Sequence, residues 1–158
     1  MTGFKLPKMD KQEIRKVVED QFLCRIAFHG AEYPYVVPFQ YTFMDDSIYL
    51  HFTDYGKKMQ LLEKDNRVCI EIEEYTPNLS EYKFVVMNGR LRVVEDFNER
   101  KRAIEKMAQE GKGKLSRSFL AAHGFYKDED WSSFTHEKPV VIVKLDNVAQ
   151  VMGLKNPQ

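Results

Sequence analysis

The sequence predicts a mainly β fold, in which about six antiparallel strands form a small closed barrel with few, short flanking helices. Three observations lead to this prediction. Apolar and polar residues alternate with period two along several runs, most regularly over residues 33–43. Turn residues separate most of these runs at hairpin length. Closure of the strands into a barrel removes exposed edges, which favours a barrel over a flat sheet.

The first elements are a helix and a strand. An amphipathic pattern over residues 10–21 predicts the helix, because its apolar residues fall on one face and charged residues cover the rest. Asp10 can cap this helix, and Glu13 stands at the spacing of a capping box. Residues 22–29 predict the first strand, and a turn follows at residues 30–32.

The run "YPYVVPFQYTF", residues 33–43, predicts a single strand because aromatic and aliphatic residues recur at every second position. Pro38 cannot donate a hydrogen bond to a neighbouring strand. It therefore indicates a sheet edge, a bulge, or a place where the strand leaves one partner. Residues 44–47 predict a tight hairpin connection, and residues 47–53 its return strand.

A short helix is predicted over residues 57–65, directly after a strand that ends in Thr53 and a turn that contains a glycine. The first amides of a helix lack intrahelical acceptors and suit an anion such as phosphate. Lys57 and Lys58 would add full positive charges, and the Thr53 hydroxyl a neutral donor. Asp54 is a carboxylate beside this position and could instead cap the helix. By itself the pattern also fits a solvated lysine pair after a turn.

The second half of the chain continues the β pattern. The predicted elements are strands over residues 67–74, 82–96 and 139–153 and a charged helix over residues 97–110. Gly89 can mark a bend or bulge in the long second of these strands. Residues 111–138 are expected to be a basic loop, a short helix near 116–122 and irregular chain. The last strand is apolar on both faces in its first half, which predicts a central or covered position.

The composition of the chain limits the classes of partner that we expect it to bind. Lys plus Arg and Asp plus Glu both number 24, so the zero formal net charge gives no support for a nucleic acid or an anionic membrane as partner. No long uncharged apolar run and no signal-peptide core are present, so we expect a cytoplasmic protein. Cys24 and Cys69 lie in apolar settings, and the four histidines lack metal-ligand spacing, so no metal site is expected.

The order of several motifs resembles a known family. "YPYVVPFQY", "IYLHFT" and "GKKMQLL", followed by "NRVCIE", occur in the order and spacing of the FMN-binding split barrels. These are the pyridoxamine 5′-phosphate oxidase-like proteins, and the nitroimidazole-resistance-like branch is the most similar. The resemblance covers residues 10 to about 94. It implies a six-stranded antiparallel split β-barrel as one domain over residues 1–158, which forms a homodimer with FMN between the two subunits.

The resemblance also implies a set of cofactor-binding residues: Val37, Pro38, Phe39 and Gln40 at the isoalloxazine, His51, Phe52 and Thr53 near the ring edge and ribityl chain, and Lys57 and Lys58 at the phosphate. Lys57 stands where the oxidases usually carry arginine. Phe84 replaces a polar residue that contacts the flavin in the family. The Arg-x-His substrate signature is absent from residues 148–158, so oxidation of pyridoxamine phosphate is not predicted.

The expected function is that of an FMN-dependent oxidoreductase, in which electrons pass from a reduced nicotinamide to a small acceptor and no residue is assigned a catalytic role. His51 could act near the flavin or be structural. Trp131 could cover the flavin of the partner subunit or serve as a packing anchor. The alternatives are a flavin or haem carrier of the same fold, a deazaflavin-dependent reductase, and a protein-interaction domain without cofactor.

Overall fold

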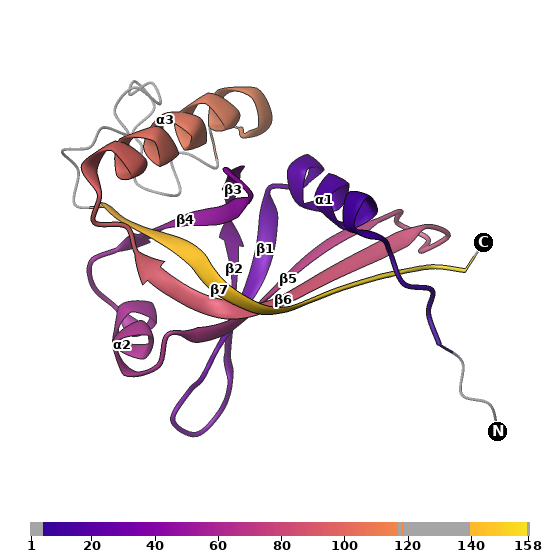
Figure 1. Ribbon diagram of the computed structural model, residues 1–158, viewed down its shortest axis with the longest axis horizontal. Coiled ribbons are helices and arrows are strands. Elements are labelled where there is room, and N and C mark those ends of the chain that lie inside the picture. The colour runs from indigo at the N-terminus through magenta and orange to yellow at the C-terminus, as the bar shows by residue number, and fades with distance from the viewer. Residues whose placement is uncertain (1–4, 117, 119–139, 158) are drawn as a thin grey trace.

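The computed structural model describes residues 5–116, 118 and 140–157. These residues form three α-helices and seven β-strands (Figure 1). The helices are α1 (Lys11–Asp20), α2 (Lys57–Lys64) and α3 (Phe97–Lys114). The strands are β1 (Leu23–Phe28), β2 (Tyr35–Gln40), β3 (Thr42–Met44), β4 (Ser47–Thr53), β5 (Arg67–Tyr75), β6 (Tyr82–Val93) and β7 (Val140–Lys155). All pairings are antiparallel, in the order β2-β1-β5-β6-β7-β4-β3.

The described strands therefore number seven rather than the six predicted. The difference arises from residues 33–43, which form two strands instead of one. β2 pairs with β1 and β3 pairs with β4, so the two halves of this run lie at opposite ends of the sheet order. Only Tyr41 separates them along the chain. The sheet consequently curls into a half-barrel whose two edge strands follow one another in sequence (Figure 1).

Tyr41 explains the division of the run. Its side chain is fully buried, and its hydroxyl donates to the Val18 carbonyl of α1 at 2.7 Å. Its amide donates to the Phe22 carbonyl at 3.0 Å. The amide bond continues the β1 ladder by one residue beyond the pair of Leu23 with Gln40, and from Thr42 onward the chain pairs with β4 instead. Pro38 pairs with Arg25 in the register of β1 and β2, and β2 is the outermost strand of the described sheet, which is the first of the three alternatives that its missing donor allowed.

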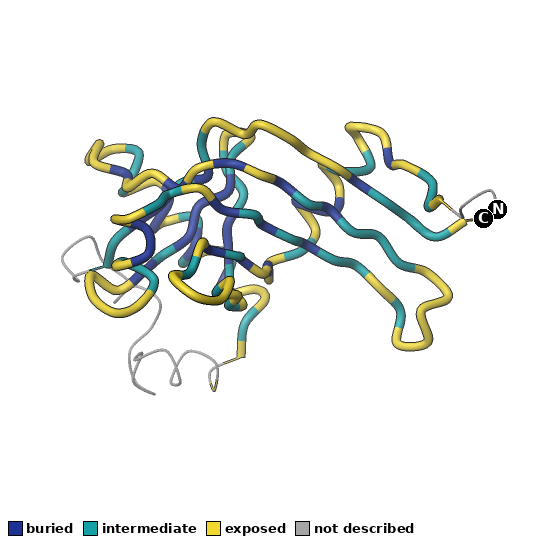
Figure 2. The backbone as a smooth tube through the Cα atoms, turned by 90° about the horizontal axis from the view of Figure 1, so that it is seen from below, coloured by how far each residue is buried: buried dark blue, intermediate teal, exposed yellow. Residues whose placement is uncertain are grey.

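The sheet has an inner face, which carries Ile26 and Ile70, and an outer face, which carries Arg25 and Glu71. α1 buries Val17 and Val18, and α2 buries Leu61 and Leu62, in the core cluster of the inner face. Figure 2 shows buried residues gathered in the curled part of the sheet, whereas the far ends of β6 and β7 are mostly intermediate or exposed. The curled end of the sheet is therefore the well-packed part of the molecule.

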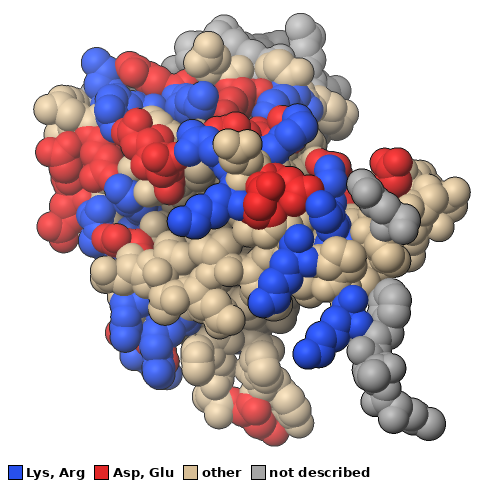
Figure 3. Space-filling view, turned by 45° about the vertical axis from the view of Figure 1, so that its right-hand side comes forward, with Lys and Arg blue, Asp and Glu red and all other residues tan. Residues whose placement is uncertain are grey.

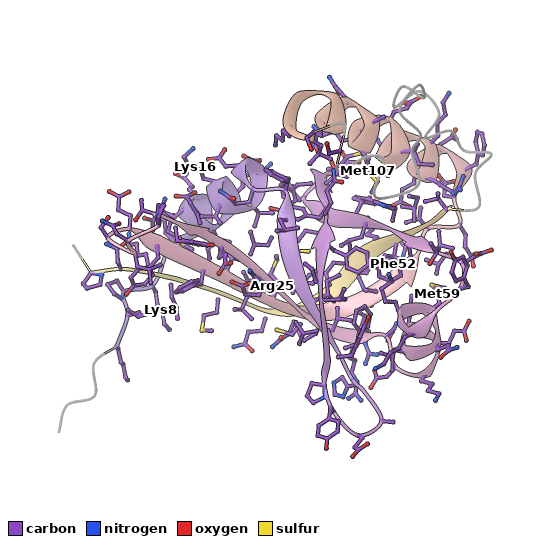
Figure 4. All side chains as sticks on the ribbon, turned by 180° about the vertical axis from the view of Figure 1, so that it is seen from behind. Lys8, Lys16, Arg25, Phe52, Met59 and Met107 are labelled. Atoms are coloured by element: carbon purple, nitrogen blue, oxygen red, sulfur yellow. The ribbon has the colours of Figure 1, made fainter. Side chains whose placement is uncertain are left out.

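α3 packs against β3 and β7 and completes a second apolar cluster with Tyr49 and Ile142. Met107 on this helix is buried there (Figure 4). The helix extends to Lys114, so the prediction that residues 111–114 belong to a loop was wrong. Apart from residues 116 and 118, the short helix expected near 116–122 lies outside the described residues, as does Trp131.

Several predictions that depend on residues close together in the sequence are confirmed by the structure. Asp10 accepts from the amides of Gln12 and Glu13, and Glu13 returns a bond to the Asp10 amide, which completes the predicted capping box. The register of β6 against β7 shifts beside Gly89, as the glycine indicated. β7 lies between β6 and β4, in the central position that its apolar first half predicted. In the described part of the chain, no helix is both long enough and apolar enough to cross a membrane.

Candidate functional site

The candidate site begins where β4 ends and α2 starts. Gly56 occupies the N-cap position of α2 with φ at 94°, a conformation that favours glycine. No side chain caps this helix, so Asp54 does not take the capping role that the sequence allowed. The Gln60 amide makes a helical bond to the Gly56 carbonyl. The amides of the first turn, which precede Gln60, can therefore bind an anion.

Two lysine side chains extend from the first turn of α2 over aromatic rings of β2. The Nζ atom of Lys57 is 4.5 Å from the centre of the Tyr35 ring, and that of Lys58 is 4.9 Å from the centre of the Phe39 ring. Cations at such distances are attracted to the ring faces. Among the described residues, no carboxylate forms an ion pair with either lysine. Two positive charges without a protein counter-charge thus lie beside the edge strand.

The rings beneath the lysines are supported by the core. The centres of Phe39 and Phe52 are 4.9 Å apart, and Phe28 lies 6.3 Å from Phe52 and 6.1 Å from Tyr35. Phe52 is only 2% exposed. Figure 4 shows Phe52 and Met59 on the side of the molecule where α2 packs. Phe52, a predicted flavin contact, therefore supports the ring of Phe39 from the core.

β2 offers an open strand edge to the same region. In the described sheet, β2 has β1 as its one neighbour, so the backbone groups on its other side are not used in strand pairing. Tyr35, Val37 and Phe39 point to the inner face and are half-buried, whereas Val36 and Pro38 are exposed on the outer face. A planar ligand could form hydrogen bonds with the backbone along this edge and contact side chains of both the inner and the outer face.

The other predicted site residues lie on different surfaces. Gln40 is half-buried at the end of β2. His51 is half-buried and, by strand alternation, lies on the face of β4 opposite Phe52. Thr53 is exposed, and its hydroxyl donates to the Tyr55 carbonyl at 2.9 Å, which stabilises the turn before α2. The structure thus brings β2 and the start of α2 together, while His51 and Thr53 lie on the other face of β4.

The sequence analysis missed Tyr35 as a site residue. Its ring lies under Lys57 and in contact with the aromatic core. The signal was available, because Tyr35 alternates in period two with Val37 and Phe39, which were both predicted to contact the ligand. Strand alternation alone would have added Tyr35 to the same face.

Charge elsewhere on the surface is balanced. Figure 3 shows Lys and Arg interspersed with Asp and Glu over the upper part of one face, with a stretch of uncharged surface below. Many lysines and arginines pair with carboxylates, as Lys16 does with Asp20 on α1, where nitrogen and oxygen are 2.6 Å apart. The lysine pair on α2 differs from these pairs in having aromatic neighbours instead of carboxylates.

The comparison with protein families decides which family this chain represents. The model described as pyridoxamine 5′-phosphate oxidase matches residues 10–126, most of the chain. The chain belongs to the pyridoxamine 5′-phosphate oxidase family. The match spans α1 to α3 and includes β2, β4 and α2, which carry the candidate site. A search of curated proteins gave no match.

Solved structures of the same fold extend over nearly the whole chain. An FAD-binding protein from Mesorhizobium loti is 23% identical, with a TM-score of 0.66 over 98% of this chain and 100% of its own. A candidate 5-nitroimidazole antibiotic resistance protein from Bacteroides thetaiotaomicron is 22% identical, with a TM-score of 0.66 over 99% and 93%. The haem storage protein HutZ from Vibrio cholerae is 15% identical, with a TM-score of 0.62 over 92% and 94%.

This member of the pyridoxamine 5′-phosphate oxidase family has an apolar residue at a position where the family pattern led us to expect a polar one. Phe84 is half-buried on the outer face of β6, and its ring centre lies 5.3 Å from that of Tyr82. The end of the chain, residues 148–158, contains neither arginine nor histidine.

Proposed function

We propose that the protein is an FMN-binding flavoprotein that passes electrons from a reduced nicotinamide to a small acceptor. The observation that carries the proposal is the position of Lys57 and Lys58, which lie over the aromatic rings of an open edge strand at a helix start without a side-chain cap. Such a place combines an anion site with a flat apolar surface, as a flavin phosphate and its ring system require.

The residues fit the phosphate of FMN. The donors are the first-turn amides of α2 and two ammonium groups, and their combined charge matches a dianion. Lys57 supplies a point charge where a planar arginine fork is usual, so it gives less geometric selection than arginine. The Thr53 hydroxyl already donates to the Tyr55 carbonyl, so it would have to exchange that bond to reach a ligand.

The residues also fit a planar ring. Val37, Pro38, Phe39 and Gln40 present backbone and side-chain groups along the free edge of β2. Bound there, FMN would supply the hydride and electron chemistry, which protein side chains do not provide. The chain itself would hold the phosphate at α2, orient the ring along β2 and exclude water through Phe39 and the core beneath it.

Relatives support the reaction class. The family is that of pyridoxamine 5′-phosphate oxidase, and proteins of the same fold include an FAD-binding protein and a candidate nitroimidazole resistance protein. We assign the chain to the nitroimidazole-resistance-like branch, as a reductase of small acceptors, because its motifs resemble that branch and the oxidase substrate signature is absent.

A carrier function is the second candidate. The fold is shared with HutZ, a haem storage protein, so a chain of this architecture need not turn over a substrate. A deazaflavin in place of FMN is a further variant of the reductase. Consumption of reduced nicotinamide in the presence of an acceptor would separate a reductase from a carrier, and mass analysis of the released pigment would separate FMN, deazaflavin and haem.

We also propose that the protein is a homodimer with the flavin at the subunit interface. Apolar residues are exposed on the outer face of four strands: Leu23, Val36, Tyr75 and Met152. In the described part of the chain, the helices that pack near β1, β5 and β6 bury their apolar residues on the inner face. A second copy would cover this surface and enclose the groove along β2.

The first experiment is the absorbance spectrum of the purified protein, followed by mass analysis of what denaturation releases. We expect a yellow protein with about one FMN per chain, in accord with one phosphate site per chain. A colourless protein that takes up no FMN on titration would overturn the proposal. A haem spectrum would favour the carrier instead.

A further inference from the structure

Tyr35 lies between the aromatic core and the candidate phosphate site. It is the first residue of β2 and pairs directly with Phe28 of β1. The centres of the two rings are 6.1 Å apart, and Phe28 is fully buried, so the Tyr35 ring has a well-packed neighbour on the core side. Tyr35 itself is half-buried, and its ring also contacts the side chain of Lys57 from α2. Packing against the core therefore fixes the ring on which Lys57 rests.

Lys57 is the more exposed of the two lysines at the start of α2. It is the first residue of the helix and is exposed, whereas Lys58 is half-buried. An exposed lysine side chain has many rotamers, so holding it in one place for a ligand costs conformational entropy. The Nζ atom of Lys57 is 4.5 Å from the centre of the Tyr35 ring, a distance at which the ring face attracts a cation. The ring therefore limits the positions that this ammonium group takes before a ligand binds.

The two aromatic rings also keep the two ammonium groups apart. Lys57 lies over Tyr35, and Lys58 lies over Phe39, four residues further along the same face of β2. Like charges on adjacent residues repel each other, and a separate ring for each lysine reduces that repulsion. An anion that binds between the two lysines would be contacted from two directions.

We infer that Tyr35 is a positioning residue for the phosphate of FMN, because its ring holds the Lys57 ammonium group at the start of α2. It would thereby increase the preference of the site for FMN over riboflavin. This inference rests on the proposed flavin function and adds a residue that acts on the ligand through Lys57. The ring makes the contacts with both Phe28 and Lys57, so phenylalanine could replace Tyr35, whereas an aliphatic residue could not.

Fluorescence titration of the apo-protein with FMN and with riboflavin measures this preference as the ratio of two dissociation constants. Tyr35→Ile removes the ring and introduces a side chain that suits a strand. It should lower the preference for FMN about two- to fivefold, the effect of one exposed cation–ring contact, and leave riboflavin binding nearly unchanged. Tyr35→Phe should retain the wild-type ratio. Equal weakening of both flavins in Tyr35→Ile would overturn the inference, because Tyr35 would then contact the flavin ring or support the strand.

A double-mutant cycle tests whether Tyr35 acts through Lys57. Lys57→Ala removes the ammonium group that the ring is inferred to hold. Tyr35→Ile should therefore cause no further change in the ratio when it is combined with Lys57→Ala. An undiminished effect of Tyr35→Ile in the absence of the Lys57 ammonium group would contradict the inferred role.

Phe43→Ile is the matched control. Phe43 is also a half-buried aromatic residue with a cation over its ring, since Arg15 Cζ lies 5.5 Å from the ring centre, but it belongs to β3. Its replacement should leave the ratio of FMN to riboflavin affinity unchanged. A change as large as that in Tyr35→Ile would show that the effect is not specific to Tyr35 and would overturn the inference.

The wild-type protein separates this inference from the proposed function. If the wild type binds FMN no more tightly than riboflavin, α2 holds no phosphate, and both the proposed site and the role of Tyr35 are wrong. If Lys58→Ala loses the preference for FMN and Tyr35→Ile retains it, the phosphate site stands and the role of Tyr35 alone is wrong. The midpoint of urea unfolding checks that each variant is folded, and Tyr35→Leu replaces Tyr35→Ile if the latter does not fold.

Discussion

The position of Lys57 and Lys58 could be predicted from the sequence, but the side chains that surround them could not. Their position at the start of a helix followed from the local pattern, because a turn with Gly56 and an amphipathic stretch are neighbours in sequence. The contact of these lysines with aromatic rings could not be predicted. Period-two alternation shows which residues share a face of a strand, but not which helix packs against that face. The structure supplied Tyr35 and Phe39 as those partners.

Lys58→Ala should weaken FMN binding far more than riboflavin binding. The ammonium group and the first-turn amides would share one phosphate dianion, and a charge-assisted contact contributes about 1.5–3 kcal/mol, so the affinity for FMN should fall about ten- to a hundredfold. Riboflavin lacks the phosphate and should be nearly unaffected. Fluorescence titration of the apo-protein with both flavins, at fixed salt concentration, measures the difference.

Lys64→Ala is the matched control, since Lys64 lies in the last turn of the same helix. Lys57→Ala should act in the same direction as Lys58→Ala, and its effect depends on how fully each ammonium reaches the phosphate. Similar affinities for FMN in Lys58→Ala and Lys64→Ala would show that the lysine pair is not a phosphate site.

At the scale of elements, the sequence was most informative where a strand or helix is defined by its own residues. The capping box of α1 and the alternation in β5 are local, and both were predicted. The division of residues 33–43 was not, because it depends on the Tyr41 side chain reaching the Val18 carbonyl and on β4 lying beside residues 42–44, which only the folded chain brings near. The same residues suit one long strand or two short ones until those contacts are known.

The packing of α1 on β7 depends on a glycine. A Cβ atom at Gly153 would stand 2.5 Å from Ile14 Cγ1 and 2.7 Å from Met9 Cε, so these two side chains, which pack between the helix and the strand, would have to shift. Gly153→Ala should therefore lower the free energy of unfolding by about 1–3 kcal/mol. Urea denaturation measures this loss. Gly113→Ala in α3 is the control, because its Cβ would meet no atom within 4 Å and alanine favours helix, so stability should not fall.

The attachment of α3 to the sheet should depend on pH. The Tyr49 hydroxyl donates to Glu99 Oε1 at 2.8 Å, and this bond, with help from Lys144, holds the pKa of Glu99 below its ordinary value. A carboxylate with a lowered pKa in the folded state stabilises the protein at neutral pH. That contribution is lost as the pH falls through and below the ordinary carboxylate range, about pH 4.

Glu99→Gln should accordingly reduce the difference in urea midpoint between about pH 7 and about pH 4, because the variant has no carboxylate to protonate at this position. Glu95→Gln, at an exposed position just before α3, should leave the wild-type difference in place. An unchanged pH profile in Glu99→Gln would mean that the bond to Tyr49 does not contribute to the pH dependence of folding.

At the scale of the whole molecule, the sequence predicted the family and a mainly β antiparallel fold, but it predicted six strands in a closed split barrel, whereas the described residues form seven strands in a half-barrel. Assembly should follow from the apolar outer face: light scattering at micromolar concentration should give about twice the chain mass of 18.6 kDa. A single-chain mass with flavin still bound would rule out a site shared between subunits.

The groove along β2, once enclosed by the second subunit, should also select the cofactor by size. FMN should bind more tightly than FAD, because a phosphate at the start of α2 leaves no designed place for an adenylate beyond it. Parallel fluorescence titrations of the apo-protein with FMN and FAD measure this preference. Equal affinities would indicate that the phosphate is not enclosed by α2 and a second subunit.

Tyr41 joins the two ends of the sheet, and this has a consequence for how the chain can vary in length. An extra residue at position 41 would shift β2 and β3 relative to each other and turn the side chains of one of them to the wrong face. The loop at residues 76–81 joins two paired strands at the surface and can lengthen without such a shift. A glycine inserted at position 41 should therefore sharply lower the yield of folded protein, whereas a glycine inserted in the loop at residues 76–81 should not. The strand that carries the candidate site thus tolerates substitution far better than insertion.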